Sequence, residues 1–169
     1  NEIVVQRKIF SPDRILHELD VRVTESLGNT DAGERVDDGM EIGILVFHQE
    51  RVLFSAAMSS LFLIHKGELE VVKGSRFSIG NQHIKREKTF SLHEIDYDQG
   101  DRFYLFSDGF QDQFGGDNDR KYSTSRFKDL LIRTSHLPMP LQREKLNEEL
   151  HSWKGANRQT DDILVVGVE

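Results

Sequence analysis

Two acidic motifs in the C-terminal half of the sequence flank apolar runs. In "YLFSDGF", Asp108 and Gly109 follow such a run, and in "QTDDILVVGV", Asp161 and Asp162 precede another. If the two runs form neighbouring antiparallel strands, the end of one and the start of the other lie at the same edge of a sheet. We therefore expect the carboxylates of Asp108 and Asp161 to approach closely enough to share or flank one cation.

Carboxylates at one sheet edge favour a hard cation such as Mg²⁺ or Mn²⁺, because the sequence has no cysteine and no closely spaced histidine pair to select zinc. Such ions acidify bound water and neutralise phosphoryl oxygens, so the chemistry indicated is on a phosphoryl group. Each motif alone has an ordinary alternative. Asp-Gly is a common turn dipeptide, and paired aspartates also end loops or cap strands.

Other kinds of site are disfavoured by composition and motifs. The absence of cysteine excludes disulfides and thiolate metal sites. Ser55 in "FSAAMSS" lacks the glycine-flanked turn of a hydrolase nucleophile, and no GxxxxGK[ST] phosphate loop occurs. A formal net charge of -7 argues against nucleic-acid binding. We interpret the basic run "HIKREK", residues 83–88, as a solvated loop or strand edge.

No apolar run of about 18 residues, the length that would span a membrane, occurs in the sequence. The N-terminus "NEIVVQRKIF" also lacks the features of a secretory signal. We therefore expect no membrane contact by this domain and a cytoplasmic location, which is compatible with the cytoplasmic part of a larger sensor protein and with which the lack of cysteine agrees.

The elements that must position the acids follow from hydrophobic periodicity. Residues 11–27 predict a helix with Ser11 as N-cap and Pro12 in the first turn, and residues 28–39 predict a loop. Short apolar or alternating segments predict antiparallel strands at residues 40–48, 51–58, 61–67 and 68–74, with two more on either side of the turn "DQGD". Two helices follow, at residues 123–135 and 140–155, and "DDILVVGVE" predicts a buried last strand. This order predicts an α+β layered domain.

The motifs together resemble a known family. "DRFYLFSDGFQDQFGG", followed further along by "WKGANRQTDDILVVGV", is similar to the C-terminal half of the SpoIIE-type serine phosphatases, bacterial members of the metal-dependent type 2C protein phosphatases. Upstream, "DDGMEIGILVF", "LFSAAMSSLFLIHKGELEVVKGSRFSIG" and the helix "SPDRILHELDVRV" occur in the order expected of that family. The resemblance covers nearly the whole chain, so residues 1–169 are expected to form one phosphatase-like domain.

The resemblance implies an antiparallel β-sandwich flanked by helices in αββα layers, with a site for two Mn²⁺ or Mg²⁺ ions at one end. It also implies hydrolysis of phosphoserine or phosphothreonine by a metal-activated water, without a covalent phosphoenzyme. Carried over by motif, Asp108 and Asp161 would be metal ligands with catalytic roles, and Asp162 a neighbouring group or occasional ligand. Gly109 would permit the turn that presents Asp108. The substrate implied is a phosphorylated regulatory protein, such as an anti-anti-sigma factor in bacterial signalling.

The sequence departs from the family pattern in one respect. The family carries an aspartate with an adjacent glycine and an Asp-x-x-Gly-x-Gly element in the N-terminal part of the domain, and neither occurs here. The acids of "DDGMEIG", residues 37–43, correspond to a different strand. We therefore expect an N-terminally truncated domain that holds half of the metal site, with weak metal affinity and little or no phosphatase activity by itself. The alternative is a catalytically inactive pseudophosphatase that binds protein partners.

Three expectations concern packing and the surface. Apolar residues at the start of a truncated domain would seek new cover, which predicts a homodimer or a tendency to aggregate. These residues are Ile3, Val4, Val5, Ile9 and Phe10. The glycine-rich stretch "FGGDNDRKYS" is either part of a substrate rim or a mobile surface loop. Trp153 is predicted to be a core anchor.

Overall fold

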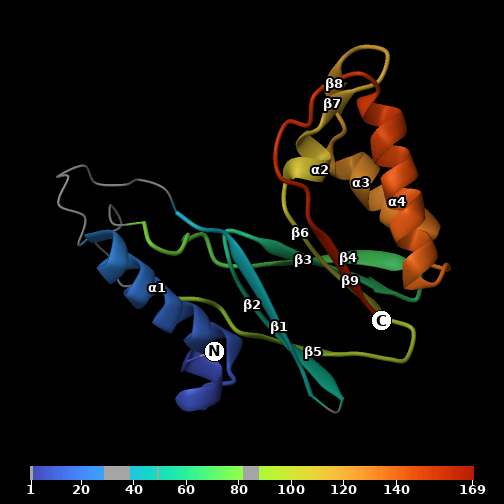
Figure 1. The fold of residues 1–169 in the computed structure, drawn as a ribbon. Coiled ribbons are helices and arrows are strands. Elements are labelled where there is room, and N and C mark those ends of the chain that lie inside the picture. Colours follow the sequence, from blue (N-terminus) through green and yellow to red (C-terminus); the bar gives the residue numbers. More distant parts are fainter. Residues whose placement is uncertain (1, 29–38, 49, 82–87) are drawn as a thin grey trace. The chain divides into compact units, whose positions relative to one another are not determined.

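The computed structural model describes residues 2–28, 39–48, 50–81 and 88–169 (Figure 1). The chain forms two compact units. The first comprises Asn1–Leu61 and Val72–Tyr97, and the second comprises Phe62–Val71 and Asp98–Glu169. Strands that pair within the sheets run antiparallel, as the predicted α+β class requires. In the described part of the chain, none of the helices has the length and apolar character needed to cross a membrane.

The first unit places a long helix on a small antiparallel sheet. Its sheet has the order β1-β2-β5, from β1 (Ile42–Phe47), β2 (Arg51–Ala57) and β5 (His93–Asp96). Helix α1 (Pro12–Gly28) occupies the range that the periodicity predicted, with its first turn at Pro12 and Asp13. Leu16 is fully buried and belongs to the same apolar cluster as Ala57 of β2 and Ile79. Most of the predicted loop, residues 29–38, lies outside the described residues.

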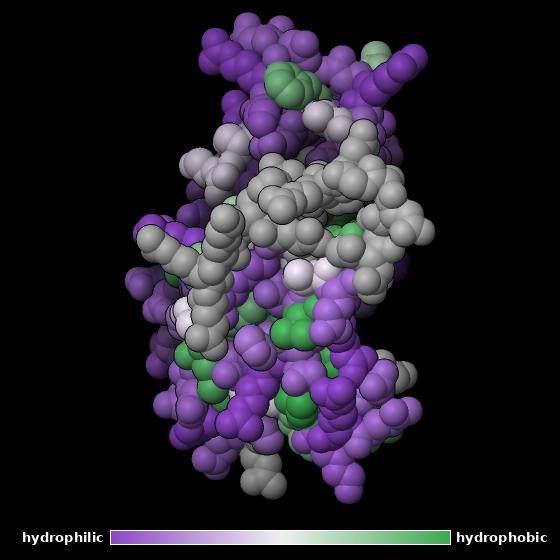
Figure 2. Space-filling view, turned by 90° about the vertical axis from the view of Figure 1, so that its left-hand side faces the viewer, coloured by the Kyte–Doolittle hydropathy of each residue, from purple (hydrophilic) through white to green (hydrophobic). Residues whose placement is uncertain are grey.

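A short π-helix, η1 (Glu2–Gln6), begins the chain and is tied to α1. The Arg22 guanidinium donates to both carboxylate oxygens of Glu2 at 2.8 Å, and this hydrogen bonding lowers the pKa of Glu2. The apolar N-terminal residues divide into two sets. Ile3 is buried, whereas Val5 and Phe10 are 65% and 56% exposed. On the face drawn in Figure 2, hydrophobic residues form separate patches within a mostly hydrophilic surface.

One basic residue of "HIKREK" does not lie where the sequence suggested. Residues 83–87 are outside the described residues, but Lys88 is only 7% exposed. Its Nζ donates to the Asp20 carboxylate at 2.6 Å and to the Ser78 carbonyl at 3.0 Å, and the same Asp20 oxygen accepts the Gly80 N–H. The interpretation of Lys88 as solvated was wrong, because a carboxylate on α1 compensates its charge inside the unit.

The second unit covers one face of a four-stranded antiparallel sheet with helices. The sheet has the order β4-β3-β6-β9. Its strands are β3 (Ser60–His65), β4 (Glu68–Lys73), β6 (Arg102–Phe106) and β9 (Val165–Val168). Helices α3 (Thr124–Thr134) and α4 (Met139–Lys154) match the predicted helices, and α4 ends before Gly155 as expected. Aromatic and aliphatic side chains of both layers form one cluster: Phe62, Ile64, Tyr104, Phe110, Tyr122, Phe127, Leu130 and Leu131.

Three short elements of this unit were not predicted. Helix α2 (Gly109–Asp112) follows β6 directly, and β7 (Phe114–Gly115) pairs with β8 (Arg120–Lys121) in a hairpin. The stretch expected to be a loop is therefore a hairpin that leads into α3 (Figure 1). Elements of two to four residues are too short to show a hydrophobic period, so the sequence gives no signal for them.

The last strand is less buried than its apolar sequence suggested. β9 is an edge strand of its sheet, and Val166 and the preceding Leu164 are 43% and 61% exposed. The prediction of a buried strand was wrong on this point: Ile163 and Val165 pack against the core cluster, but the alternate residues Leu164 and Val166 are exposed, and an apolar run does not show which faces of a strand are covered.

Candidate metal-binding edge of the second unit

The pairing of β6 with β9 brings the two acidic motifs together. The strands are antiparallel with Phe106 opposite Val165, so the end of β6 lies beside the start of β9, as the sequence predicted. The pairing continues past the strands, since the Ser107 N–H donates to the Leu164 carbonyl at 3.0 Å. Asp108 therefore begins its turn at the edge where Asp161 and Asp162 enter β9.

Ser107 and Gly109 fix the contact between the two segments. The Ser107 hydroxyl donates to the Asp162 carbonyl at 2.7 Å and accepts the Leu164 N–H at 2.9 Å. A Cβ at Gly109 would clash with the Asp162 carbonyl oxygen and would lie 2.9 Å from its carbon. Only glycine allows so close an approach. Ser107 was not identified from the sequence, although it directly precedes the Asp-Gly pair.

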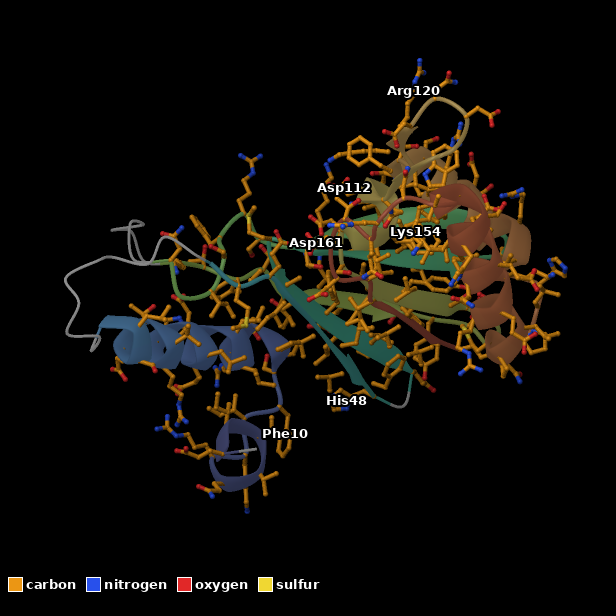
Figure 3. All side chains as sticks on the ribbon, turned by 45° about the horizontal axis from the view of Figure 1, so that its top comes forward. Phe10, His48, Asp112, Arg120, Lys154 and Asp161 are labelled. Atoms are coloured by element: carbon orange, nitrogen blue, oxygen red, sulfur yellow. The ribbon has the colours of Figure 1, made fainter. Side chains whose placement is uncertain are left out.

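The three aspartates present their carboxylates to solvent. Asp108 is the N-cap residue of α2, and its side chain makes no capping hydrogen bond. One Asp161 oxygen accepts the Asp162 N–H at 2.7 Å, which holds that carboxylate against its own turn. Figure 3 shows Asp161 on the segment that leads into β9 and Asp112 at the end of α2. Exposed oxygen donors on short, hydrogen-bonded turns are suited to a hard divalent cation rather than to zinc.

The described residues offer at most part of a ligand shell for a cation. No three histidine or acidic side chains in the described ranges lie close enough together to hold a metal by themselves. Mg²⁺ nevertheless usually keeps several waters and is held by only one or two carboxylates, so the donor set fits a cation held partly by water. The roles of Asp108, Gly109, Asp161 and Asp162 as site residues stay a prediction.

Gln113 connects the same two segments further from the sheet. It follows α2, is fully buried, and uses both ends of its amide. Its Nε2 donates to the Arg158 carbonyl at 2.9 Å, and its Oε1 accepts the Thr160 N–H at 3.2 Å. No sequence signal indicated this residue, because its partners are distant along the chain.

The β7–β8 hairpin rests on the end of α4 through Trp153. The indole Nε1 donates to the Gln113 carbonyl at 3.0 Å, and the ring lies edge-on to Tyr122 with centroids 5.3 Å apart. A Cβ at Gly116 would lie 2.8 Å from the indole ring, so glycine is required there for this packing. Trp153 is the anchor that the sequence predicted, and what it anchors is the hairpin.

Charges on this side of the unit are mixed. Lys121 of β8 pairs with Asp112 of α2 at 2.7 Å, and Arg120 is exposed near the hairpin tip (Figure 3).

Burial, followed by the hydrogen bond to Glu149, raises the pKa of Tyr122 well above its ordinary value.

Sequence comparison identifies the family. Residues 4–169 match the family described as Stage II sporulation protein E (SpoIIE). The chain belongs to the SpoIIE family. None of the curated proteins matches this SpoIIE-family chain closely enough in sequence to count as a relative.

Solved structures with the same fold are phosphatase domains and a secretion regulator. The SiaA-PP2C domain of Pseudomonas aeruginosa has a TM-score of 0.78 and 27% identity, over 94% of this chain and 60% of its own. PppA, a key regulatory component of T6SS in the same organism, has a TM-score of 0.63 and 19% identity, over 90% and 65%. The Mn-presoaked phosphatase domain of SpoIIE from Bacillus subtilis has a TM-score of 0.54 and 17% identity, over 88% and 70%. The predicted fold class is confirmed, and the chain spans less than two thirds of the SiaA-PP2C and PppA chains.

Proposed function

We propose that this SpoIIE-family chain is a metal-dependent protein phosphatase domain that hydrolyses phosphoserine or phosphothreonine on a regulatory protein. The observation that carries the proposal is the β6–β9 register. It brings the segment that bears Asp108 and the segment that bears Asp161 and Asp162 to one edge of the sheet. There the Ser107 hydroxyl is hydrogen-bonded to the main chain on either side of Ile163, the residue that follows Asp162. Family membership supplies the chemistry that such an edge would serve.

Each residue has a distinct role in the proposal. Asp108 and Asp161 hold Mn²⁺ or Mg²⁺ through their carboxylates, Asp162 stands beside them, and Gly109 keeps the two turns in contact. A bound divalent cation acidifies water and offsets the charge of phosphoryl oxygens, and two ions often act together. The complete site is proposed to take two ions, because the resemblance to the metal-dependent type 2C phosphatases implies a two-ion site. The exposure of all three aspartates leaves the edge open to a phosphate carried by a protein.

The substrate is proposed to be a phosphorylated regulatory protein of the anti-anti-sigma kind, in a bacterial cytoplasm. The open edge supports a protein-borne phosphate over a small enclosed ligand, since enclosed sites bury most of their ligand. The β7–β8 hairpin is proposed as part of the rim that meets such a substrate. It is joined to the Asp161 segment through Asn157, whose amide donates to Asp119 at 2.7 Å.

The test follows Mn²⁺ binding and phosphate release on the same samples. Amide signals of residues 107–113 and 160–164 should broaden first when the labelled chain is titrated with Mn²⁺. Asp108→Asn and Asp161→Asn should each weaken this binding by about tenfold or more, while Asp129→Asn, an exposed acid on α3, should not. At saturating Mn²⁺ we expect slow, Asp108-dependent release of phosphate from a phosphoserine protein.

A second candidate is a catalytically inactive interaction domain. It is favoured by the lack of a three-residue metal cluster among the described ranges. The two candidate functions predict different results in the Mn²⁺-binding and phosphate-release experiment. Asp108-dependent phosphate release would reject the interaction domain, whereas Mn²⁺ binding without any release would favour it. Release that persists in Asp108→Asn would reject the role assigned to Asp108.

A further inference from the structure

We propose that Gln113 is a positioning residue that sets the turn of Asp161 and Asp162 for cation binding. This inference rests on the proposed function, because it assigns a purpose to a contact of the same edge. Gln113 is not proposed to contact the reacting atoms. It acts through the main chain of the segment that carries the two aspartates.

The segment before β9 has little packing of its own. Every side chain from residue 155 to residue 162 is exposed, so no buried apolar group holds this stretch in place. Its position depends instead on hydrogen bonds. Gln113 supplies two of them, to the carbonyl of Arg158 and to the N–H of Thr160, directly before Asp161.

The turn that carries Asp161 and Asp162 is hydrogen-bonded on both sides to a single short segment, residues 107–113. Gln113 fixes the entry at residues 158 and 160, and Ser107 fixes the exit at Asp162 and Leu164. Asp108 lies between Ser107 and Gln113 on the same piece. The hydrogen bonds of Ser107 and Gln113, at the two ends of residues 107–113, therefore determine how far the Asp108 turn lies from the Asp161 turn.

Gln113 is itself fixed on every side. Its second amide hydrogen is used by the Phe114 carbonyl at 3.0 Å, and its own carbonyl accepts from Trp153 Nε1 and from the Tyr122 N–H at 2.9 Å. The residue is fully buried, so a replacement must supply a donor and an acceptor at the same reach. Leucine supplies neither, and glutamate keeps only the acceptor.

Gln142 provides a matched control in the same unit. It is also buried, at 1% exposure, and it also bridges two groups. Its Oε1 accepts the Tyr104 hydroxyl at 2.7 Å and its Nε2 donates to the Leu137 carbonyl at 2.8 Å. Neither bond reaches residues 158–162. Gln142→Leu therefore removes a buried amide of the same kind without touching the aspartate turn.

The experiment compares Gln113→Leu, Gln113→Glu and Gln142→Leu with the wild-type chain. We expect Gln113→Leu to weaken Mn²⁺ binding, measured by amide broadening, by about tenfold or more, the usual effect of losing a partner that orients metal ligands. Gln113→Glu should fall between it and the wild type, and Gln142→Leu should bind as the wild type does. Without metal, the Thr160 amide should exchange faster in Gln113→Leu than in Gln142→Leu.

The possible failures are distinct. A wild-type chain whose residues 107–113 and 160–164 do not respond to Mn²⁺ would reject the proposed function, and this inference with it. A wild-type chain that binds Mn²⁺ no better than Gln113→Leu would overturn the inference alone. If Gln113→Leu does not fold, Gln113→Glu decides, and wild-type affinity in that variant overturns the proposal.

Discussion

Replacing Gly109 by alanine adds one methyl group at the contact between the two aspartate-bearing segments. The new Cβ would clash with the Asp162 carbonyl oxygen, lie 2.9 Å from the carbonyl carbon and lie 3.1 Å from Ile163 Cγ1. The backbone atoms of Asp162 cannot rotate away as a side chain could. The carbonyl carbon alone would have to move by about 0.5 Å to reach an ordinary contact distance of 3.4 Å, and the carbonyl oxygen, which is closer, would have to move further.

The size of the effect follows from two opposed terms. Forcing an extra methyl into a packed contact costs about 1–3 kcal/mol. Alanine recovers about 0.5–1 kcal/mol relative to glycine in a helix, and Gly109 is the first residue of α2. We expect the free energy of unfolding to fall by about 1–2 kcal/mol as the net result of overpacking and this gain. Because Asp162 must move, Mn²⁺ binding should weaken as well.

Urea unfolding followed by circular dichroism measures the first effect, and Mn²⁺ titration measures the second. Gly67→Ala in the β3–β4 turn is the control. Gly67 has a φ of 82° and nothing near its Cβ position, so alanine there costs about 1–2 kcal/mol of backbone strain without a clash. The two variants should lose similar stability, and only Gly109→Ala should lose Mn²⁺ affinity.

Two results would refute this reasoning. Unchanged stability in Gly109→Ala would mean that the Asp162 main chain yields freely, so that Ser107 and Gln113 do not hold it. An equal loss of Mn²⁺ affinity in both variants would mean that affinity follows global stability rather than the position of Asp162.

Three further outcomes are expected. Lys88→Met should lower the free energy of unfolding by about 3 kcal/mol, because it leaves the Asp20 carboxylate without its cation, and the double variant with Asp20→Leu should recover part of the loss in urea titrations. Because the pKa of Tyr122 is raised above its ordinary 10.0, the unfolded chain loses this proton first. Its contribution to stability is therefore complete below pH 10 and declines above it, and Tyr122→Phe should make the decline in stability between pH 10 and about 11.5 shallower. Sedimentation at high concentration should show dimers or larger species, since Val5 and Phe10 are largely exposed; a monomer throughout would contradict the prediction.

The edge that gathers the aspartates could be predicted because it depends only on the order and direction of the strands. Apolar runs next to Asp108 and Asp161 indicated strands, and antiparallel pairing then required their acidic ends to meet. The contacts that hold this edge could not be predicted in the same way. Gln113 meets Arg158 and Thr160 only after the chain has folded, and nothing in "QDQFGG" distinguishes it from an exposed glutamine.

Burial was predicted less well where it depended on distant partners. Lys88 belongs to a basic run, which usually lies in solvent, but Asp20 on α1 compensates its charge inside the first unit. β9 was expected to be buried because its residues are apolar, yet Leu164 and Val166, which share one face of this segment, are exposed. In both cases the missing information is the tertiary neighbour rather than the local propensity.

Trp153 is the one tryptophan of the chain, and its surroundings make it an optical reporter of the hairpin. Its indole N–H is bound to the Gln113 carbonyl, and the Arg126 guanidinium lies 4.3 Å from the ring centroid. Both interactions influence indole emission, and Tyr122 is close enough to transfer excitation energy to it. Any displacement of the β7–β8 hairpin by a docking protein would thus change the fluorescence of the unlabelled chain. Stopped-flow recording could then resolve when the hairpin moves relative to the proposed phosphate release, with no dye attached near the aspartates.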